Sequence, residues 1–497
     1  MIADLVSTGA VVALYAPALR FALVGDDYQW LQLAHRALHR PLLLLSDLDT
    51  FYRPTSTWTL ALDRLLAGHR AFGYHLTNLL LHAAAGVGLA LAARRLGLGP
   101  GYAWAAGLLW AASPFTEEPA VAVAIRFEDL LALAWLVMVA GWPKPTERWS
   151  RWRVAMITSA VVFAALSKET WVVTPALIAA LELVQHRSGR RAALPIALAA
   201  AAALVYVAVY FVVFPGDKAY YQLSLAPLAK VPHELAAFLH LEGLVPLAFT
   251  FTRAGAVAMA MIIGLAILGF RWQPQAAAVG VALLIAPTLP TLLVPYLPTR
   301  YTAVPYAGFL LLAAAVAQGG VREVTPRRRP IAVAGATALG LLVLVSGAVT
   351  VRADLVDGAR LSQVSSRLLR EAEAVAPAFP LGRPVLVLRA EANNPARDIM
   401  MSPHGLPKLI FTRHPDPDGL IDAAALFEWA LNRAGVAVKR YDDGEERFRG
   451  QSGAILEHRR DGFVWLTTHT PDIGAAAQAY RHAGIRYRLI EAEPLSR

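Results

Sequence analysis

Long apolar segments recur along this chain as far as Val351, and short loops rich in arginine and lysine separate many of them. Over all 497 residues, 57% are hydrophobic and only 16% are charged, whereas a soluble protein carries about 25% charged residues. A helix that crosses a bilayer needs about 20 apolar residues. The sequence therefore predicts a polytopic α-helical membrane protein and argues against a series of soluble domains.

We predict about eleven transmembrane helices. The first, at residues 2–24, lacks the basic start of a signal peptide, so we expect it to be retained. An apolar stretch at residues 232–251 would put the basic loop at 322–329 outside the cell if it crossed the membrane, so we expect it to lie at the interface. The other ten spans are expected at residues 74–93, 102–112, 130–142, 154–166, 171–184, 192–214, 254–270, 276–296, 301–317 and 331–351.

The loop charges predict the orientation in an inner or plasma membrane. With the N-terminus in the cytoplasm, the basic residues at 94–95, 148–153 and 327–329 all fall on the cytoplasmic side, as the positive-inside rule requires. The first outer loop, residues 25–73, is expected to carry two short amphipathic helices on the membrane surface, at 30–38 and 57–66.

Residues 352–497 have the composition of a soluble domain, and the same count puts them outside the membrane. Strand and helix patterns alternate there, which predicts a small extracytoplasmic α/β domain behind the transmembrane domain of residues 1–351. Strands are expected at 384–389, 436–439 and 462–467, and helices at 423–434, ended by Gly435, and at 473–483.

The polar residues with the strongest functional potential all fall on the outer side. Ionisable groups near membrane depth are candidates for function, and four separate outer loops carry them here. They are Asp26 and Asp27, then Arg53, then Glu117, Glu118, Arg126 and Glu128, then Lys168 and Glu169, and finally Arg300 with Tyr301. A carboxylate in such a set could act as a general base, and the cations could hold a phosphate.

Several sequence motifs resemble those of polytopic C-type glycosyltransferases related to the protein O-mannosyltransferases. Residues 53–82 contain RP and FGYHLTNLLLH, and residues 113–128 align without gaps to HPxxxExVxWxxxRxD. Glu118, Arg126 and Glu128 fall on the acid, the arginine and the final acid of that pattern. Ser167-Lys168-Glu169 matches SKE, and Arg300-Tyr301 followed by Pro305 matches RYxYxP. The nearest group is the transmembrane O-mannosyltransferases that often carry tetratricopeptide repeats.

The resemblance implies a polyprenyl-phosphate-sugar donor and inverting transfer to a hydroxyl outside the membrane. It implies a catalytic acid in the first outer loop, where Asp27 is the expected base and Asp26 positions it or shares the role. Donor-phosphate contacts are implied for Lys168, Arg126 and Arg300, with Glu169 and Tyr301 supporting them. Glu118, Glu128 and Arg53 complete the expected substrate-binding set, although Arg53 could instead be an interfacial anchor.

The sequence departs from this family in three places. Ser113 and Thr116 replace the histidines of the HPxxH pattern, Glu128 replaces an aspartate, and no tetratricopeptide repeats follow the last span. No cofactor is indicated, and a divalent metal ion stays an open alternative. His75 and His82 lie seven residues apart on one helix face, but we expect hydrogen-bonded packing histidines there.

Other functions stay open. The sugar is expected to be mannose-like, and its acceptor could be a protein, a lipid or a cell-wall glycan. A lipid-linked-sugar transporter or binding protein would use the same basic and acidic groove without a base. Nucleic acid is not expected as a partner, because the 46 basic residues, against 36 acidic ones, gather in membrane loops. The absence of cysteine excludes disulfides and thiol chemistry.

Overall fold

The computed structural model describes residues 2–45, 51–144, 146–186, 196–197, 199–208, 238, 253–293, 299–389, 423–434, 436–441, 444–459, 462–483 and 487–494. The chain forms two compact units. The first contains Met1–Pro17, Pro41–Thr59 and His75–Leu355. The second contains Ala18–Arg40, Leu60–Tyr74 and Val356–Arg497. The residues expected in the first outer loop are therefore shared between the two units.

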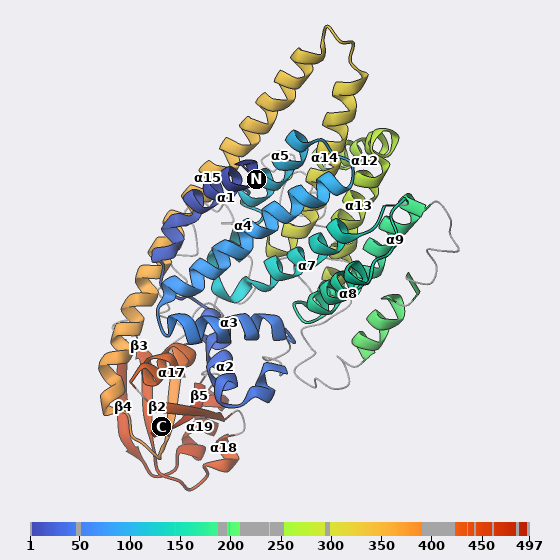
Figure 1. The fold of residues 1–497 in the computed structure, drawn as a ribbon. Helices are drawn as coiled ribbons and strands as arrows, with labels where there is room; N and C mark the ends of the chain where they lie inside the picture. Colours follow the sequence, from blue (N-terminus) through green and yellow to red (C-terminus); the bar gives the residue numbers. More distant parts are fainter. Residues whose placement is uncertain are drawn as a thin grey trace. The chain divides into compact units, whose positions relative to one another are not determined.

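The first unit is a bundle of helices. Figure 1 shows α4, α5, α7, α13 and α14 lying together in it. Its helices are α1 (Ile2–Tyr15), most of α4 (Ala71–Arg95), α5 (Pro100–Ala111), α6 (Glu117–Val121), α7 (Phe127–Gly141), α8 (Arg151–Ala165), α9 (Thr174–His186), α12 (Arg253–Trp272), α13 (Pro274–Ile285), α14 (Ala303–Glu323) and the first part of α15 (Arg329–Val375). The short 3₁₀ segments η4 (Glu169–Val173) and η9 (Thr299–Thr302) link them.

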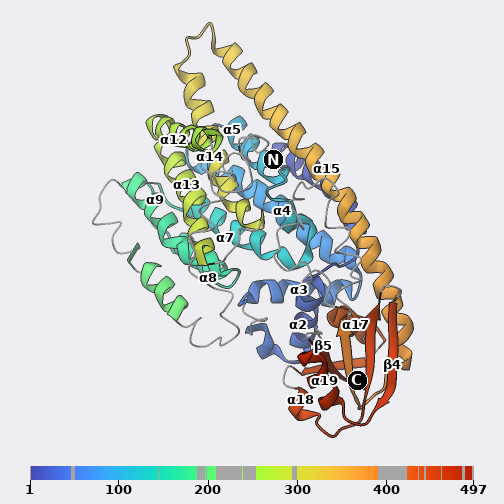
Figure 2. The ribbon, with the colours of Figure 1, turned by 180° about the vertical axis from the view of Figure 1, so that it is seen from behind.

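Helices α13 and α14 pack side by side, as Figure 2 shows from behind. Their contact depends on small residues. A Cβ atom on Gly308 would lie 2.4 Å from the backbone nitrogen of Leu284 and 2.5 Å from the carbonyl oxygen of Gly280. Any side chain at Gly308 would therefore separate the two helices, which is the usual reason for glycine at membrane helix contacts.

Three helices among the described residues are long and apolar enough to cross a membrane: Ala71–Arg95, Ala303–Glu323 and Arg329–Ala378. Shorter apolar helices occur at Ala199–Ala208, Ala256–Trp272 and Pro274–Pro290. The polytopic helical fold expected from the sequence is thus present. The expected interfacial stretch at residues 232–251 lies almost wholly outside the described residues.

Two predicted spans are interrupted at prolines. The first was expected over residues 2–24, but α1 ends at Tyr15 and a 3₁₀ turn, η1, covers Ala16–Arg20. The span expected at 276–296 begins as α13, which gives way to the 3₁₀ segment η8 over Ala286–Leu293, with Pro290 inside it. Proline lacks the N–H that continues an α-helix and restricts the residue before it. A prediction of spans from hydropathy alone takes neither effect of proline into account.

The helix that contains the last predicted span is longer than expected. It was expected to end at Val351, but α15 continues to Val375 over 47 residues. The residues after Val351 are more polar but contain no proline until Pro377, so the helix continues beyond its apolar part.

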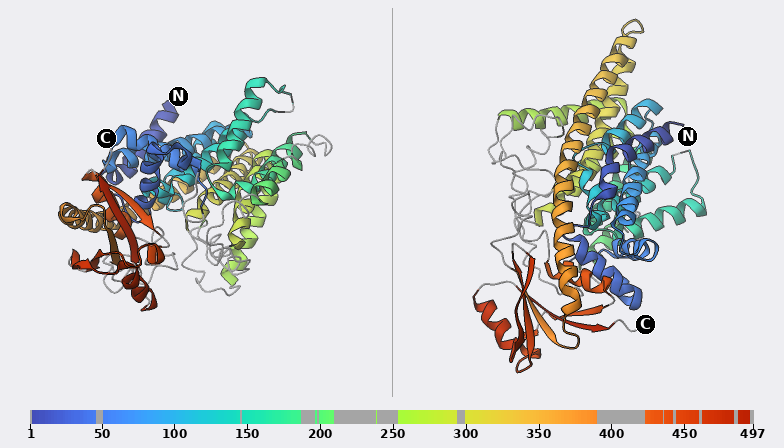
Figure 3. Two further views of the ribbon diagram at one scale, coloured as in Figure 1. Left: turned by 90° about the horizontal axis from the view of Figure 1, so that it is seen from below. Right: turned by 90° about the vertical axis from the view of Figure 1, so that its left-hand side faces the viewer.

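The second unit contains α2 (Asp27–His39), the later part of α15, α17 (Ala423–Arg433), α18 (Gly444–Arg447) and α19 (Ile473–His482) with a sheet of five strands. The strands are β1 (Pro384–Arg389), β2 (Val436–Tyr441), β3 (Gly453–Arg459), β4 (Gly462–Thr470) and β5 (Tyr487–Pro494). Figure 3 shows them as one twisted sheet. Their order is β2-β5-β1-β3-β4, with β1 and β3 parallel and the other pairs antiparallel.

One face of the sheet is buried under helix α19. The buried side chains are Leu386, Leu388, Phe448, Ile455, Ile473, Ala477 and Leu489. The strand expected at residues 384–389 is β1, and the helices expected at 423–434 and 473–483 correspond to α17 and α19. Strands β3 and β5 and the short helix α18 were not expected, and Gly435 lies outside the described residues.

Candidate functional site

Two ion pairs, one of them fully buried, bring together four of the predicted site residues in the first unit. The Lys168 ammonium pairs with the Glu128 carboxylate, and both side chains are 3% exposed. Arg53 donates from Nε to Glu169 Oε1 at 3.2 Å and from Nη2 to Oε2 at 3.1 Å. The second pair is a bidentate guanidinium–carboxylate contact, the geometry that fixes both groups most firmly.

Aromatic rings join the two pairs into one group. The Arg53 guanidinium lies 3.7 Å from the centroid of the Phe127 ring and 4.3 Å from that of Phe51. The Lys168 ammonium lies 4.0 Å from the Tyr301 centroid and 5.7 Å from that of Phe127. Both cations are thus held against ring faces, which attract positive charge. We call Arg53, Phe127, Glu128, Lys168, Glu169 and Tyr301 the cation site.

Local structure explains why these residues meet. Glu128 lies in the first turn of α7, and Lys168 is the extended residue (φ −162°, ψ 147°) that precedes η4. Thr55 ties the start of α3 (Pro54–Ala67) to the same segment: its backbone nitrogen donates to the Leu166 carbonyl at 3.0 Å, and its hydroxyl lies 2.9 Å from Ser167 Oγ. Arg53 is therefore fixed beside Glu169.

Burial lowers the pKa of Lys168 from 10.5 to about 8, because the charged form loses its hydration. The Glu128 carboxylate opposes this shift, and the positive charge of Arg53 adds to it. Lys168 is therefore a cation at neutral pH that can lose its proton slightly above it. Two buried cations on aromatic supports can bind the oxygens of a phosphate.

The predicted site residues in α6 and just before α7 are also buried. Arg126, which directly precedes α7, is 0% exposed, and Glu118 of α6 is 8% exposed. Glu117 is also fully buried, and burial raises the pKa of its carboxyl well above the usual range, with Asp354 of α15 as the next cause. Burial therefore favours the protonated form of Glu117.

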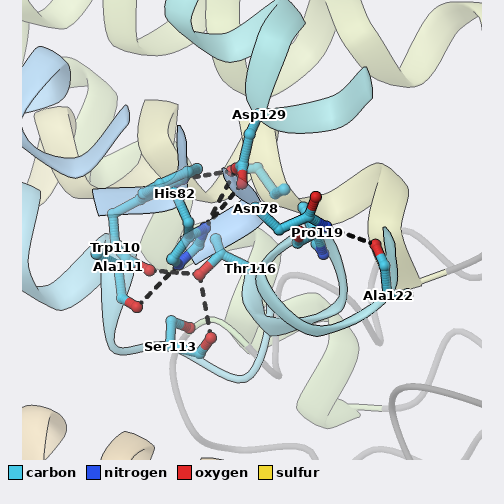
Figure 4. A network of polar contacts seen from close by, with 10 residues as sticks. Asn78, His82, Trp110, Ala111, Ser113, Thr116, Pro119, Ala122 and Asp129 are labelled. Carbon is cyan, nitrogen blue, oxygen red and sulfur yellow. Dashed lines mark hydrogen bonds and ion pairs between the residues drawn. The ribbon is translucent and has the colours of Figure 1, made fainter. Parts of the chain in front are cut away.

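A separate polar network connects α4, α5 and α7 (Figure 4). His82 Nδ1 lies 3.2 Å from both carboxylate oxygens of Asp129, and Nε2 lies 3.0 Å from the Ala111 carbonyl oxygen. The Asn78 amide donates to the carbonyls of Pro119 and Ala122 at 2.9 and 2.8 Å. His82 has the hydrogen-bonded packing role expected from the sequence. His75 is likewise buried, at 1% exposure.

Asp26 and Asp27 belong to the second unit, and the surroundings of the two side chains differ from each other. Gly25 adopts φ 55°, a left-handed conformation that favours glycine, and α2 begins two residues later. Asp27 is 1% exposed and its Oδ2 accepts a hydrogen bond from the Val24 backbone nitrogen at 2.9 Å. Asp26 is exposed and makes no side-chain cap contact.

The residue after Asp27 is anchored to α15. Ser365 Oγ donates to the Leu23 carbonyl at 2.6 Å and lies 3.0 Å from the Tyr28 hydroxyl. Because the single hydroxyl proton of Ser365 goes to Leu23, the Tyr28 hydroxyl is the donor in the second contact. Ser362 Oγ accepts from the Ala22 nitrogen at 2.7 Å. Residues 22–28 are therefore fixed by two serines of the same helix.

The predicted residues thus fall into three groups. Arg53, Glu128, Lys168, Glu169 and Tyr301 contact one another. Arg126 and Glu118 are buried in the first unit, and Asp26 and Asp27 lie in the second. The backbone of Arg300 belongs to η9, but its side chain lies outside the described part of the chain. Among the described residues, no group of three or more histidine, aspartate or glutamate side chains could hold a metal ion.

The structure adds residues that the sequence analysis did not select. Phe127 lies between two matched motif residues, Arg126 and Glu128, and its position there was the available signal. Ser365 and Tyr28 carried no signal, because 337 positions separate them.

Comparisons with known proteins show sequence similarity over part of the chain and a shared fold over nearly all of it. No family model matches the chain. The human protein O-mannosyl-transferase TMTC2 is 30% identical over 151 residues, which cover 28% of this chain and 18% of TMTC2, and its mouse counterpart matches equally. The chain therefore spans about a fifth of the curated relatives. The crystal structure of ArnT from Cupriavidus metallidurans bound to undecaprenyl phosphate has a TM-score of 0.51 at 15% identity, over 98% of this chain and 97% of ArnT. The chain therefore has the fold of ArnT, and 151 of its residues resemble a part of the protein O-mannosyl-transferase TMTC2.

Proposed function

We propose that this protein is a membrane glycosyltransferase. It transfers a mannose-like sugar from a polyprenyl-phosphate carrier to an acceptor hydroxyl on the extracytoplasmic side, with inversion. The observation that supports this most strongly is the cation site, where Arg53 and Lys168 are both buried on aromatic rings in loops that face outward in the predicted topology. The ArnT structure of the same fold contains undecaprenyl phosphate, a carrier of the proposed class.

Asp27 is the proposed general base. The acceptor hydroxyl gives its proton to the Asp27 carboxylate as its oxygen forms a bond to the anomeric carbon of the sugar. The bond between that carbon and the phosphate oxygen breaks, and polyprenyl phosphate leaves with the electron pair. Attack from the face opposite the leaving group inverts the configuration. The buried, backbone-bonded setting of Asp27 supports this role better than the exposed position of Asp26.

The cation site is proposed to hold the donor phosphate. Negative charge grows on the phosphate as the sugar leaves, and fixed cations stabilise that charge most where water is excluded. Lys168 and Arg53 would contact the phosphate, while Glu128 and Glu169 keep both cations in place before the donor binds. Arg126, Glu118 and Arg300 are proposed to complete the donor-binding set, with Tyr301 supporting Lys168.

The transfer itself is the first test. Purified chain in proteoliposomes, supplied with polyprenyl phosphate carrying radiolabelled mannose and with peptide, lipid or glycan acceptors in separate reactions, should move label to one acceptor class. Each labelled product should be matched by one released polyprenyl phosphate. Saturable donor binding without a product from any acceptor class would favour a lipid-linked-sugar transporter or binding protein instead.

The proposed topology has eleven spans, a cytoplasmic N-terminus and an extracytoplasmic α/β domain after Arg352. Loop charges support it, since the basic loops alternate with the acidic ones. A reporter that is active only outside the cytoplasmic membrane, fused after Arg497, should be active, and the same reporter placed in the loop at residues 322–329 should be silent. Activity at both positions, or the reverse pattern, would contradict the eleven-span count.

A further inference from the structure

A second group of basic side chains lies in the second unit, and its central ring, Trp429, lies 6.3 Å from the Tyr28 ring of α2. It consists of His35 and His39 of α2, Arg64 of α3 and His69 of the following loop, arranged around Trp429 of α17 with Arg433; we call it the basic cluster. The His35 and His39 ring centroids are 5.3 Å apart. Trp429 lies 4.9 Å from the His69 centroid and 5.1 Å from the Arg64 guanidinium carbon. Arg64 and His69 thus meet at one ring of α17, and the charge of Arg64 also acts on His35.

Several of these nitrogens are buried without a hydrogen-bond partner in the described part of the chain: His35 Nδ1, His69 Nε2 and Arg64 Nη1, with Gln32 Nε2 beside them on α2. A buried donor that lacks a hydrogen-bond partner destabilises the fold. Gln32 does use its oxygen, which accepts from Asn432 at 2.6 Å, so α2 and α17 are firmly connected here. These buried nitrogens therefore destabilise the fold unless a ligand supplies hydrogen-bond acceptors for them.

The charge of the basic cluster points to the sign of that ligand. Burial, and after it the positive charges of Arg64 and Arg433, lower the pKa of His69 to about 3. Burial likewise lowers the pKa of His35 to about 4, with Arg64, His39 and Arg36 as the charges that act on it. Arg433 is paired with Glu373 at 2.6 Å, and the buried acids Asp63 and Glu428 adjoin Arg64 and Trp429 in sequence. Both imidazole rings are therefore neutral at neutral pH, and Arg64 is the cation that acts on both of them.

We propose that the basic cluster binds a phosphate group carried by the acceptor substrate. Arg64 and the two histidine rings donate to its oxygens, while buried Trp429 fixes Arg64 and His69 in orientation. The inference rests on the proposed function for the identity of the ligand as acceptor. Helix α2 joins the two sites, since it begins at Asp27 and His35 follows eight residues later, about 12 Å along the axis.

Phosphate binding can be measured without any sugar transfer. The full chain in nanodiscs, with its histidines labelled at Cε1, is titrated at neutral pH with inorganic phosphate, and with sodium chloride at matched ionic strength. The ring signals of His35 and His69 should shift saturably with phosphate and not with chloride. Nanodiscs that contain phosphatidic acid in place of phosphatidylcholine form a second arm: a response there alone assigns the site to a lipid phosphate, and a response to inorganic phosphate assigns it to the phosphate group itself.

Matched variants complete the test. Arg64→Gln should weaken binding at least about tenfold, because a charge-assisted hydrogen bond is lost, whereas Arg70→Gln removes an exposed charge nearby and should leave binding unchanged. Should Arg64→Gln fail to fold, His69→Gln tests the same site, and Arg64→Lys should retain most of the affinity. Equal responses to phosphate and chloride, or equal affinities in the Arg64 and Arg70 variants, overturn the proposal. Because no donor is present, these outcomes are independent of whether the chain transfers sugar.

Discussion

Asp27→Asn is expected to lower sugar transfer about 10²–10⁴-fold, the usual contribution of a positioned general base. The amide oxygen of asparagine can still accept the hydrogen bond from the Val24 nitrogen, so the start of α2 should keep its structure. The amide cannot take a proton from the acceptor hydroxyl. The turnover number should therefore decrease, while the affinity for polyprenyl-phosphate-sugar stays within a few-fold of that of the wild type.

Asp26→Asn is the matched control. It removes one charge from the adjacent residue, which is exposed and makes no side-chain cap contact. We expect transfer to change less than about threefold, since surface substitutions rarely disturb more than about 0.5 kcal/mol. A large loss with Asp26→Asn and none with Asp27→Asn would give the base role to Asp26. Full activity in both variants would show that the general base does not lie in the first outer loop.

From the sequence, Asp27 was the expected base and Asp26 a residue that positions it or shares the role, but nothing in the sequence distinguished the surroundings of the two side chains. The choice depends on the left-handed turn at Gly25 and on where the chain turns into α2, which buries one carboxylate and leaves its neighbour in solvent. The serines that fix this turn come from α15, more than 300 positions away in the chain. A side chain such as Ser365 has an ordinary sequence context, so nothing local marks it.

The fold was predictable to the extent that composition determines it. Apolar runs gave the helical class, and alternation gave β1 at its observed bounds. The ends of α1 and α13 could also have been predicted from Pro17 and from Pro287 and Pro290, had backbone chemistry been weighed with hydropathy. The ring contacts of the cation site could not have been predicted from the sequence, because they join loops that are close only after the helices have packed.

Lys168→Met is expected to impair both stability and transfer, for different reasons. It leaves the Glu128 carboxylate buried without its cation, a loss that typically costs about 3–5 kcal/mol. It also removes one of the two proposed phosphate contacts. The double variant Lys168→Met with Glu128→Leu separates the effects, because replacing a whole buried pair by apolar residues is often neutral for stability. Thermal unfolding in detergent should recover in the double variant, whereas donor affinity and transfer should stay low. Recovery of both transfer and stability in the double variant would show that the Lys168–Glu128 pair has only a structural role.

The pH dependence of transfer tests the same residue in the intact protein. Burial lowers the pKa of Lys168 to about 8, so its ammonium is present below that pH and is lost as pH rises through it. Donor affinity should therefore decline between about pH 7 and pH 9, since the neutral amine no longer attracts phosphate. Lys168→Arg keeps the positive charge over this whole range, because a guanidinium has a pKa above about 12. That variant should bind donor with little change from pH 7 to pH 9, even if its absolute affinity is lower. An unaltered alkaline decline in Lys168→Arg would assign the titration to another group and would remove Lys168 from the phosphate contacts.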